Sequence, residues 1–258
     1  MSVADRPFDL VLFDLDGTLI DSAPQLALAV NRTLAELGLA EADEAVVRTW
    51  VGNGADKLIQ RALDYRDAPE QFAKARPLFD RHYQACLLEG LAMYDGVARS
   101  LRRLQGLGYQ QAVVTNKPSH FVQPILEALG ISDCFALWLG GNCVPVKKPS
   151  PEPLLHACHE LGVSPSRTLM VGDSENDVLA AQAAGMNPLY MTTNDTALEF
   201  GLSNDYKMYD NFTIMLDAAY LATWLDQSKS VWGNSQMNGK NDEVRDPWNV
   251  NVSFIYKF

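Results

Sequence analysis

The sequence predicts an α/β fold: a parallel sheet with helices on both faces and a helical segment inserted after the first strand. Two observations predict this architecture. Short apolar runs typical of buried strands alternate with longer helical patterns, the order expected for parallel strands joined by helices. Between the first apolar run and the rest of the chain, a long stretch shows apolar residues at helical spacing and no strand pattern.

Three apolar runs are predicted as strands because each ends abruptly in polar residues. They cover residues 8–13, 111–115 and 168–171. Helical patterns cover residues 97–107, 119–129, 151–161 and 176–184. Glycines that suit a left-handed helix end lie close behind them, at Gly108, Gly130, Gly162 and Gly185. This alternation predicts a Rossmann-like core.

The predicted elements divide the 258 residues into three parts. Residues 1–21 and 92–226 form the α/β core. Residues 22–91 form an all-helical cap, where Leu26, Val30 and Leu34 recur at helical spacing. Residues 227–258 are rich in Asn and Ser without clear periodicity, so we expect a loosely ordered C-terminal extension.

Composition excludes several classes of partner. Acidic residues outnumber basic ones by 32 to 21, for a net charge of −11, which is unlike the basic surface of a protein that binds duplex nucleic acid. No apolar run approaches the ~20 residues that span a bilayer. The four cysteines form no C-x-x-C pair and are expected to be free thiols, which indicates the cytoplasm.

The first candidate site follows the first predicted strand. Asp14 and Asp16 lie at its end, and ligands bind at the carboxyl edge of parallel sheets. Two close carboxylates repel each other and invite a hard cation such as Mg²⁺. A solvated turn is the alternative, because Asp-Gly is common in turns.

Three further groups follow strands or precede helices, and each has an ordinary structural alternative. Thr115 and Asn116 could hold a phosphate oxygen or form a simple turn. Lys148 precedes a helix and could meet an anion or be solvated. Asp173 and Asp177 share a face at a helix start, where carboxylates also suit the helix dipole, and Ser174 between them can cap that helix.

Taken in order, these groups resemble the four motifs of the haloacid dehalogenase-like phosphatases. The motifs are Asp-Leu-Asp-Gly-Thr, Val-Thr-Asn-Lys-Pro, Lys-Lys-Pro and Gly-Asp-Ser-x-Asn-Asp, and the inserted segment resembles the first type of helical cap in that family. Residues 50–56, 113–118 and 146–155 resemble the phosphoglycolate phosphatases among them. The resemblance runs from Phe8 to Leu189.

The resemblance implies a role for each motif residue. Asp14 attacks phosphorus, and Asp16 protonates the leaving oxygen and then activates water. Mg²⁺ is held by the Asp14 carboxylate, the Asp16 backbone carbonyl and Asp173. The phosphoryl oxygens are held by Thr115, Asn116 and Lys148. Asp177 steers Lys148 or a metal-bound water from behind.

The implied activity is a Mg²⁺-dependent phosphatase for a small phosphorylated metabolite, with 2-phosphoglycolate as the leading substrate. Asp16 favours phosphoryl transfer over dehalogenation, because an alkoxide leaving group needs a proton and a halide does not. A pyrophosphatase, a β-phosphoglucomutase-like phosphotransferase and a non-catalytic phospho-ligand binder stay open.

The cap supplies the expected specificity determinants. The loop containing Gly52 and Asn53 is predicted to contact substrate. Lys57 could meet a substrate carboxylate such as that of glycolate, although a solvated helix lysine is the favoured interpretation.

The sequence departs from the family pattern in two places. Gly140-Gly141-Asn142-Cys143 has an amide where the family often has Asp, and beyond Leu189 the resemblance fades. A change of reading frame near Pro188 is one hypothesis for the second departure, and resequencing the DNA tests it.

Overall fold

The computed structural model describes residues 8–194 and 197–201. The expected extension, residues 227–258, and the last part of the expected core, residues 202–226, lie outside the described residues. Within the described part of the chain, no helix is long and apolar enough to cross a membrane.

The core is a six-stranded sheet with the order β5-β4-β1-β6-β7-β8. The first five strands in this order are parallel, and β8 pairs antiparallel with β7. In the register, Leu10 of the central strand lies opposite Gln110 on one side and Thr168 on the other. The strands are β1 (Leu10–Phe13), β4 (Gln110–Val114), β5 (Leu137–Leu139), β6 (Thr168–Gly172), β7 (Asn187–Asn194) and β8 (Ala197–Gly201).

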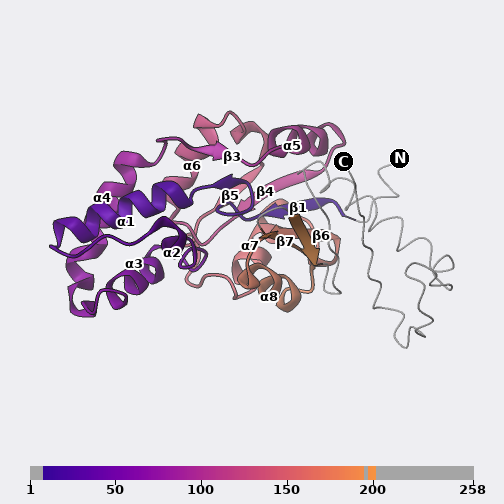
Figure 1. Ribbon diagram of the computed structural model, residues 1–258. Coiled ribbons are helices and arrows are strands. Elements are labelled where there is room, and N and C mark those ends of the chain that lie inside the picture. Colours follow the sequence, from indigo (N-terminus) through magenta and orange to yellow (C-terminus); the bar gives the residue numbers. More distant parts are fainter. Residues whose placement is uncertain (1–7, 195–196, 202–258) are drawn as a thin grey trace, which may run out of the picture.

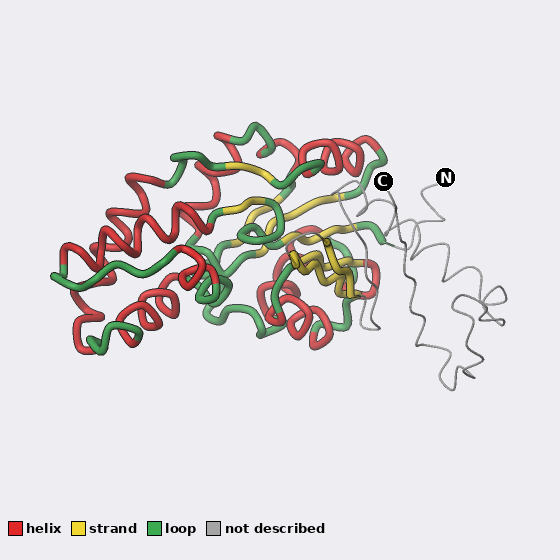
Figure 2. The backbone as a smooth tube through the Cα atoms, viewed as in Figure 1, coloured by secondary structure: helices red, strands yellow, loops and turns green. Residues whose placement is uncertain are grey.

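Helices cover both faces of this sheet, which confirms the predicted fold class (Figures 1 and 2). Successive side chains of a strand point to opposite faces. Val11 and Phe13 of β1 accordingly join one apolar cluster with α5 and α6, and Leu10 and Leu12 join another with α7 and α8. The helices are α5 (Val97–Gly106), α6 (Ser119–Ala128), α7 (Glu152–Leu161) and α8 (Glu175–Ala183), with short 3₁₀ turns at Ser132–Cys134 and Pro165–Arg167. The glycines predicted at their ends all have positive φ.

The inserted segment is helical, as the spacing of its apolar residues predicts. Its helices form a lobe beside the sheet (Figure 1). Leu26, Val30 and Leu34 are buried on one face of α1, and that face packs among the apolar side chains of α3 and α4. The elements are α1 (Ala23–Glu36), α2 (Glu44–Arg48), α3 (Ala55–Asp64), a 3₁₀ turn (Pro69–Gln71) and α4 (Phe72–Cys86).

The chain enters and leaves the lobe through two short paired strands. β2 (Ile20–Asp21) lies antiparallel to β3 (Ala92–Met93), so the two connections run side by side. A further backbone bond from Tyr94 N to Leu19 O extends the contact. Two residues are too few to show an alternating pattern, which is why the sequence does not predict these strands.

The two neighbouring leucines of α7 test how the core is packed. Leu154 is fully buried and Leu155 is 39% exposed. We expect Leu154→Ala to lower the free energy of unfolding by about 2 to 5 kcal/mol, because it leaves a cavity under the sheet. Leu155→Ala should cost about 0.5 kcal/mol or less. Urea denaturation of both variants measures this difference, and equal losses would contradict the assignment of the buried face.

Candidate active site

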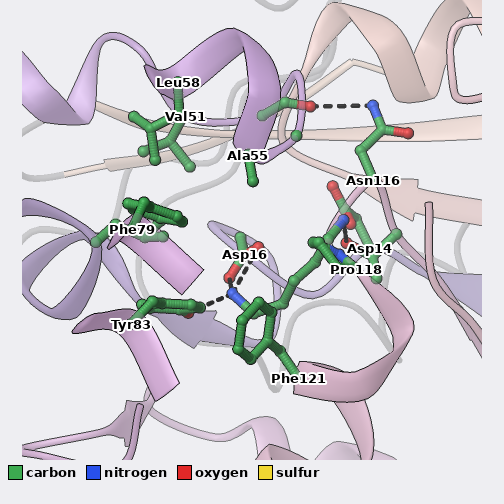
Figure 3. A pocket seen from close by; sticks show the side chains of 15 residues that line it. Asp14, Asp16, Val51, Ala55, Leu58, Phe79, Tyr83, Asn116, Pro118 and Phe121 are labelled. Carbon is green, nitrogen blue, oxygen red and sulfur yellow. Dashed lines mark hydrogen bonds and ion pairs between the residues drawn. The ribbon is translucent and has the colours of Figure 1, made fainter. Parts of the chain in front are cut away.

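A cleft lies between the carboxyl edge of the sheet and the helical lobe. Its empty volume is about 450 Å³, including its opening to solvent. Figure 3 shows Val51, Ala55 and Leu58 on the side of the lobe, and Asp14 and Asn116 on the side of the sheet. The cleft therefore combines a mostly apolar wall with a floor of polar side chains.

Asp14 forms part of this floor and is buried. Its backbone N–H donates to Val171 O of β6 at 2.9 Å, which holds the residue at the strand end. One carboxylate oxygen accepts a bond from Leu15 N at 2.7 Å. Burial raises the pKa of Asp14 from 3.8 to about 6, although the positive charge of Lys148 opposes the rise.

Lys148 places a buried ammonium group among these carboxylates. Its Nζ lies 2.5 Å from Asp177 Oδ1 and 3.2 Å from Asp14 Oδ1, and it donates to Val114 O at 2.7 Å. Burial by itself would lower the pKa of Lys148, but Asp14 and Asp177 outweigh it and raise that pKa. The lysine is thus held protonated beside the carboxylate that the sequence predicts as the nucleophile.

Asp177 is tied to the start of α8 as well as to Lys148. Its Oδ2 accepts bonds from the backbone N–H and the hydroxyl of Ser174. The first of these bonds belongs to a capping box, in which the Ser174 side chain in turn accepts from the backbone N–H of Asp177. Gly172 leaves room for it, since a Cβ there would lie 2.3 Å from Asp177 Cγ. The structure therefore places Asp177 behind Lys148.

Carboxylate oxygens of Asp14, Asp173 and Asp177 lie within 4.8 Å of one another. Asp173 accepts a bond from Thr18 Oγ1 at 2.7 Å. Burial, and then the charge of Asp14, raise the pKa of Asp173 to about 8. Gly17 approaches it closely with φ +84°, where a Cβ would lie 2.1 Å from Asp173 Oδ2. Oxygen ligands that crowd and repel in this way fit a hard divalent cation.

The carboxylate of Asp16 points away from this cluster and toward the lobe. It accepts bonds from Ser22 Oγ at 2.5 Å and from Lys117 Nζ at 2.8 and 3.1 Å. Asp16 lines the cleft beside Asp14. The two aspartates of the first motif therefore have separate surroundings. Asp14 lies with Asp173 and Asp177, whereas the carboxylate of Asp16 contacts Ser22 and Lys117.

Thr115 and Asn116 both lie at the end of β4 and line the cleft, but their side chains have different hydrogen-bond partners. Thr115 Oγ1 accepts a bond from Lys117 N at 3.2 Å. The amide of Asn116 accepts from Lys148 N and donates to Lys148 O, both at 3.0 Å, and it also donates to Gly52 O of the cap at 3.1 Å. In this structure Asn116 joins the backbones of two loops.

Gly52 and Gly54 of the cap loop line the cleft. Asn53, a predicted substrate contact, is half-buried and is not one of the described residues that line the cleft. Lys57 lies exposed on α3 and is likewise absent from that lining.

Two residues that meet at Asp16 were not predicted from the sequence as part of the site. Lys117 is buried, and its ammonium group contacts both Asp16 and the hydroxyl of Tyr83 from α4 (Figure 3). The position of Lys117 directly after Asn116, at the same strand end, could have indicated it. Tyr83 carries no such signal, because only the folding of α4 over the sheet brings it near.

Asn142, one of the departures from the family pattern, has a structural use. Its Oδ1 accepts a bond from Ser119 N at 2.8 Å, at the start of α6. The amide oxygen supplies the acceptor that a helix N-terminus needs. A carboxylate is not required for this contact.

Comparison with known proteins agrees with the fold and the motifs. A family model described as haloacid dehalogenase-like hydrolase matches residues 8–185. The chain belongs to this family. The phosphoglycolate phosphatase of Colwellia psychrerythraea is 46% identical over 190 residues, which are 71% of this chain and 84% of that protein.

Solved structures of the haloacid dehalogenase-like family share the fold. A predicted phosphoglycolate phosphatase from Haemophilus somnus 129PT has 42% identity and a TM-score of 0.68, over 70% of this chain and 84% of that one. CbbY from Rhodobacter sphaeroides, in complex with phosphate, has 28% identity and a TM-score of 0.64, over 72% of this chain and 87% of that one.

The raised pKa of Asp173 predicts how stability depends on pH without metal. The folded state holds the proton of Asp173 up to about pH 8, whereas the unfolded state releases it near 3.8. Metal-free protein should therefore lose stability as pH rises from about 5 to about 8, and Asp14 acts in the same direction. In Asp173→Asn we expect the fall in Tm over this range to shrink by roughly 5 °C.

Thermal unfolding in EDTA measures this difference, with Asp64→Asn on the exposed face of α3 as the matched control. Added divalent cation should raise the Tm of the wild type more at the higher pH, because its ligands are then ionised, and should raise that of Asp173→Asn little. Identical pH dependence of the wild type and Asp173→Asn would contradict the assignment.

Proposed function

We propose that this protein is a Mg²⁺-dependent phosphomonoesterase that hydrolyses 2-phosphoglycolate to glycolate and phosphate. The observation that carries the proposal is the meeting of Asp14, Lys148 and Asp173 at one edge of the sheet. The name of the Colwellia relative, a phosphoglycolate phosphatase, supports the substrate.

The chemistry assigns the nucleophile to Asp14. Its carboxylate oxygen attacks phosphorus, the bond to the ester oxygen breaks, and an aspartyl-phosphate forms. Lys148, 3.2 Å from Asp14 Oδ1, is placed to bind a phosphoryl oxygen and to stabilise its developing charge. Thr115 and the backbone of Asn116 complete the phosphoryl site. The side-chain amide of Asn116 is already hydrogen-bonded to the backbone of Lys148.

Asp16 serves as the general acid and then as the general base. It donates a proton to the departing alkoxide and later takes one from the water that attacks the phosphoenzyme. Its separation from the Asp14 cluster, through bonds to Ser22 and Lys117, suits a group that addresses the leaving-group side of phosphorus.

The carboxylates of Asp14 and Asp173 and the backbone carbonyl of Asp16 would hold Mg²⁺, with Asp177 behind Lys148. Oxygen-only donors are the ligands that Mg²⁺ takes in proteins. When bound, the cation neutralises charge on the phosphoryl group and the aspartates. We assign the residues 22–91 as the cap that closes over the site and excludes water, with β2 and β3 as its paired connections.

The lining of the cleft favours a small substrate. Its wall on the lobe side is apolar, with Leu26, Val51, Leu58 and Phe79. A second phosphate, as in pyrophosphate or a sugar bisphosphate, would need more cationic partners than this wall offers. The free thiols of all four cysteines accord with a cytoplasmic enzyme.

A phosphate-release screen with Mg²⁺ over 2-phosphoglycolate, pyrophosphate, sugar phosphates and nucleotides tests the substrate. We expect 2-phosphoglycolate to have the highest kcat/KM. Release from pyrophosphate alone would favour the pyrophosphatase, transfer between hexose positions would favour the mutase, and release from none would favour a non-catalytic binder.

Asp14→Asn tests the nucleophile. The amide is nearly isosteric but is not nucleophilic, so we expect kcat to fall by about four orders of magnitude or more. Circular dichroism should show an unchanged fold, because the bond from Leu15 N can be accepted by the amide oxygen. A folded variant with turnover like that of the wild type would remove Asp14 from its role.

A further inference from the structure

Lys117 is the one cationic side chain among the described residues that line the cleft. Its side chain is 2% exposed, and its Nζ lies 2.8 Å from Asp16 Oδ1. Lys148, the other buried lysine of the site, is not among the described residues that line the cleft, and it contacts Asp14 and Asp177 instead. An anionic group carried by the leaving part of a substrate would therefore meet Lys117 first.

The lobe fixes the position of this ammonium group. The Tyr83 hydroxyl bonds to Lys117 Nζ, and the ammonium also lies 4.7 Å from the centre of the Tyr83 ring. The ring itself is stacked on Phe79 at 5.5 Å and meets Phe121 edge-on at 4.8 Å. Figure 3 shows these three rings gathered beside Asp16. Aromatic walls exclude water and so strengthen any ion pair made here.

The placement of Lys117 next to Asp16 decides which anion it could bind. Asp16 acts on the ester oxygen of the substrate, so atoms bonded close to that oxygen come within reach of Lys117. An ammonium group has three N–H donors, and here they contact both Asp16 oxygens and the Tyr83 hydroxyl. A substrate carboxylate would take the place of the longer contact to Asp16, the 3.1 Å bond to Oδ2. In 2-phosphoglycolate the carboxylate carbon is separated from the ester oxygen by a single methylene.

We propose that Lys117 is a specificity-determining residue that binds the carboxylate of the substrate. The site thereby selects phosphate monoesters that carry a carboxylate on the carbon bonded to the ester oxygen. This inference rests on the proposed function and assigns its substrate preference to the core loop after β4. The cap contributes Phe79 and Tyr83, and the core contributes Phe121. Exposed Lys57 has no part in this contact.

The test compares kcat/KM for 2-phosphoglycolate with that for 2-hydroxyethyl phosphate, in which an uncharged hydroxymethyl group replaces the carboxylate. Lys117→Met keeps the length of the side chain and removes its charge. It also removes a partner of Asp16, so turnover of both substrates should fall. We expect kcat/KM for 2-phosphoglycolate to fall about 100-fold further than for 2-hydroxyethyl phosphate. Lys57→Met should leave the ratio of the two unchanged.

Equal losses on both substrates in Lys117→Met would overturn the inference, because the residue would then act only through Asp16. A changed ratio in Lys57→Met would also overturn it, in favour of the cap lysine. If the wild type hydrolyses neither substrate, the proposed function fails and this inference with it.

Tyr83→Phe decides the matter if Lys117→Met does not fold, since it keeps the packed ring and removes only the hydroxyl. The KM for 2-phosphoglycolate should then rise about fivefold more than the KM for 2-hydroxyethyl phosphate. An equal rise for both substrates would overturn the inference.

Discussion

The buried ammonium group of Lys148 is the contact on which the rest of the site depends. Removing one partner from a buried cluster of charges leaves the others uncompensated, which is strongly destabilising. Lys148 stands between Asp14 of the first strand end and Asp177 of α8, and its backbone is held by Asn116 from β4. Lys148 thus joins the segments that follow three neighbouring strands, β4, β1 and β6.

The formal charges of the site balance once both buried lysines and a divalent cation are included. Asp14, Asp16, Asp173 and Asp177 face Lys117 and Lys148, and one divalent cation would neutralise the remainder. The net charge of −11 is therefore no obstacle to an anionic substrate. It is local charge that decides binding at a cleft with low-dielectric walls.

The ends of β1, β4 and β6 could be predicted because each of these strands is an apolar run that stops at a polar residue. Asp14, Thr115 and Asp173 were found in this way, and the family resemblance supplied their roles. The antiparallel strand β8 was not predicted, because it follows the point where the resemblance fades. The two-residue strands β2 and β3 were missed because a pattern needs more residues to show itself.

Contacts that depend on tertiary structure could not be predicted from the sequence. The bond that Lys117 Nζ donates to the Tyr83 hydroxyl joins a core loop to a cap helix, and no local sequence pattern indicates it. Asn116 was expected to bind the substrate, but its side-chain amide is hydrogen-bonded to Lys148 and Gly52. These bonds depend on three loops that are far apart in the sequence and meet in the fold. The order of the motifs predicted which residues gather, whereas packing decides what each side chain contacts.

The most direct test of the account is a single-turnover reaction stopped in acid, followed by mass spectrometry of the digested protein. The account predicts that 2-phosphoglycolate transiently adds one phosphoryl group to the peptide that contains Asp14. A phosphoryl group on any other residue would contradict it, as would complete consumption of the substrate with no protein-bound phosphate at any time point.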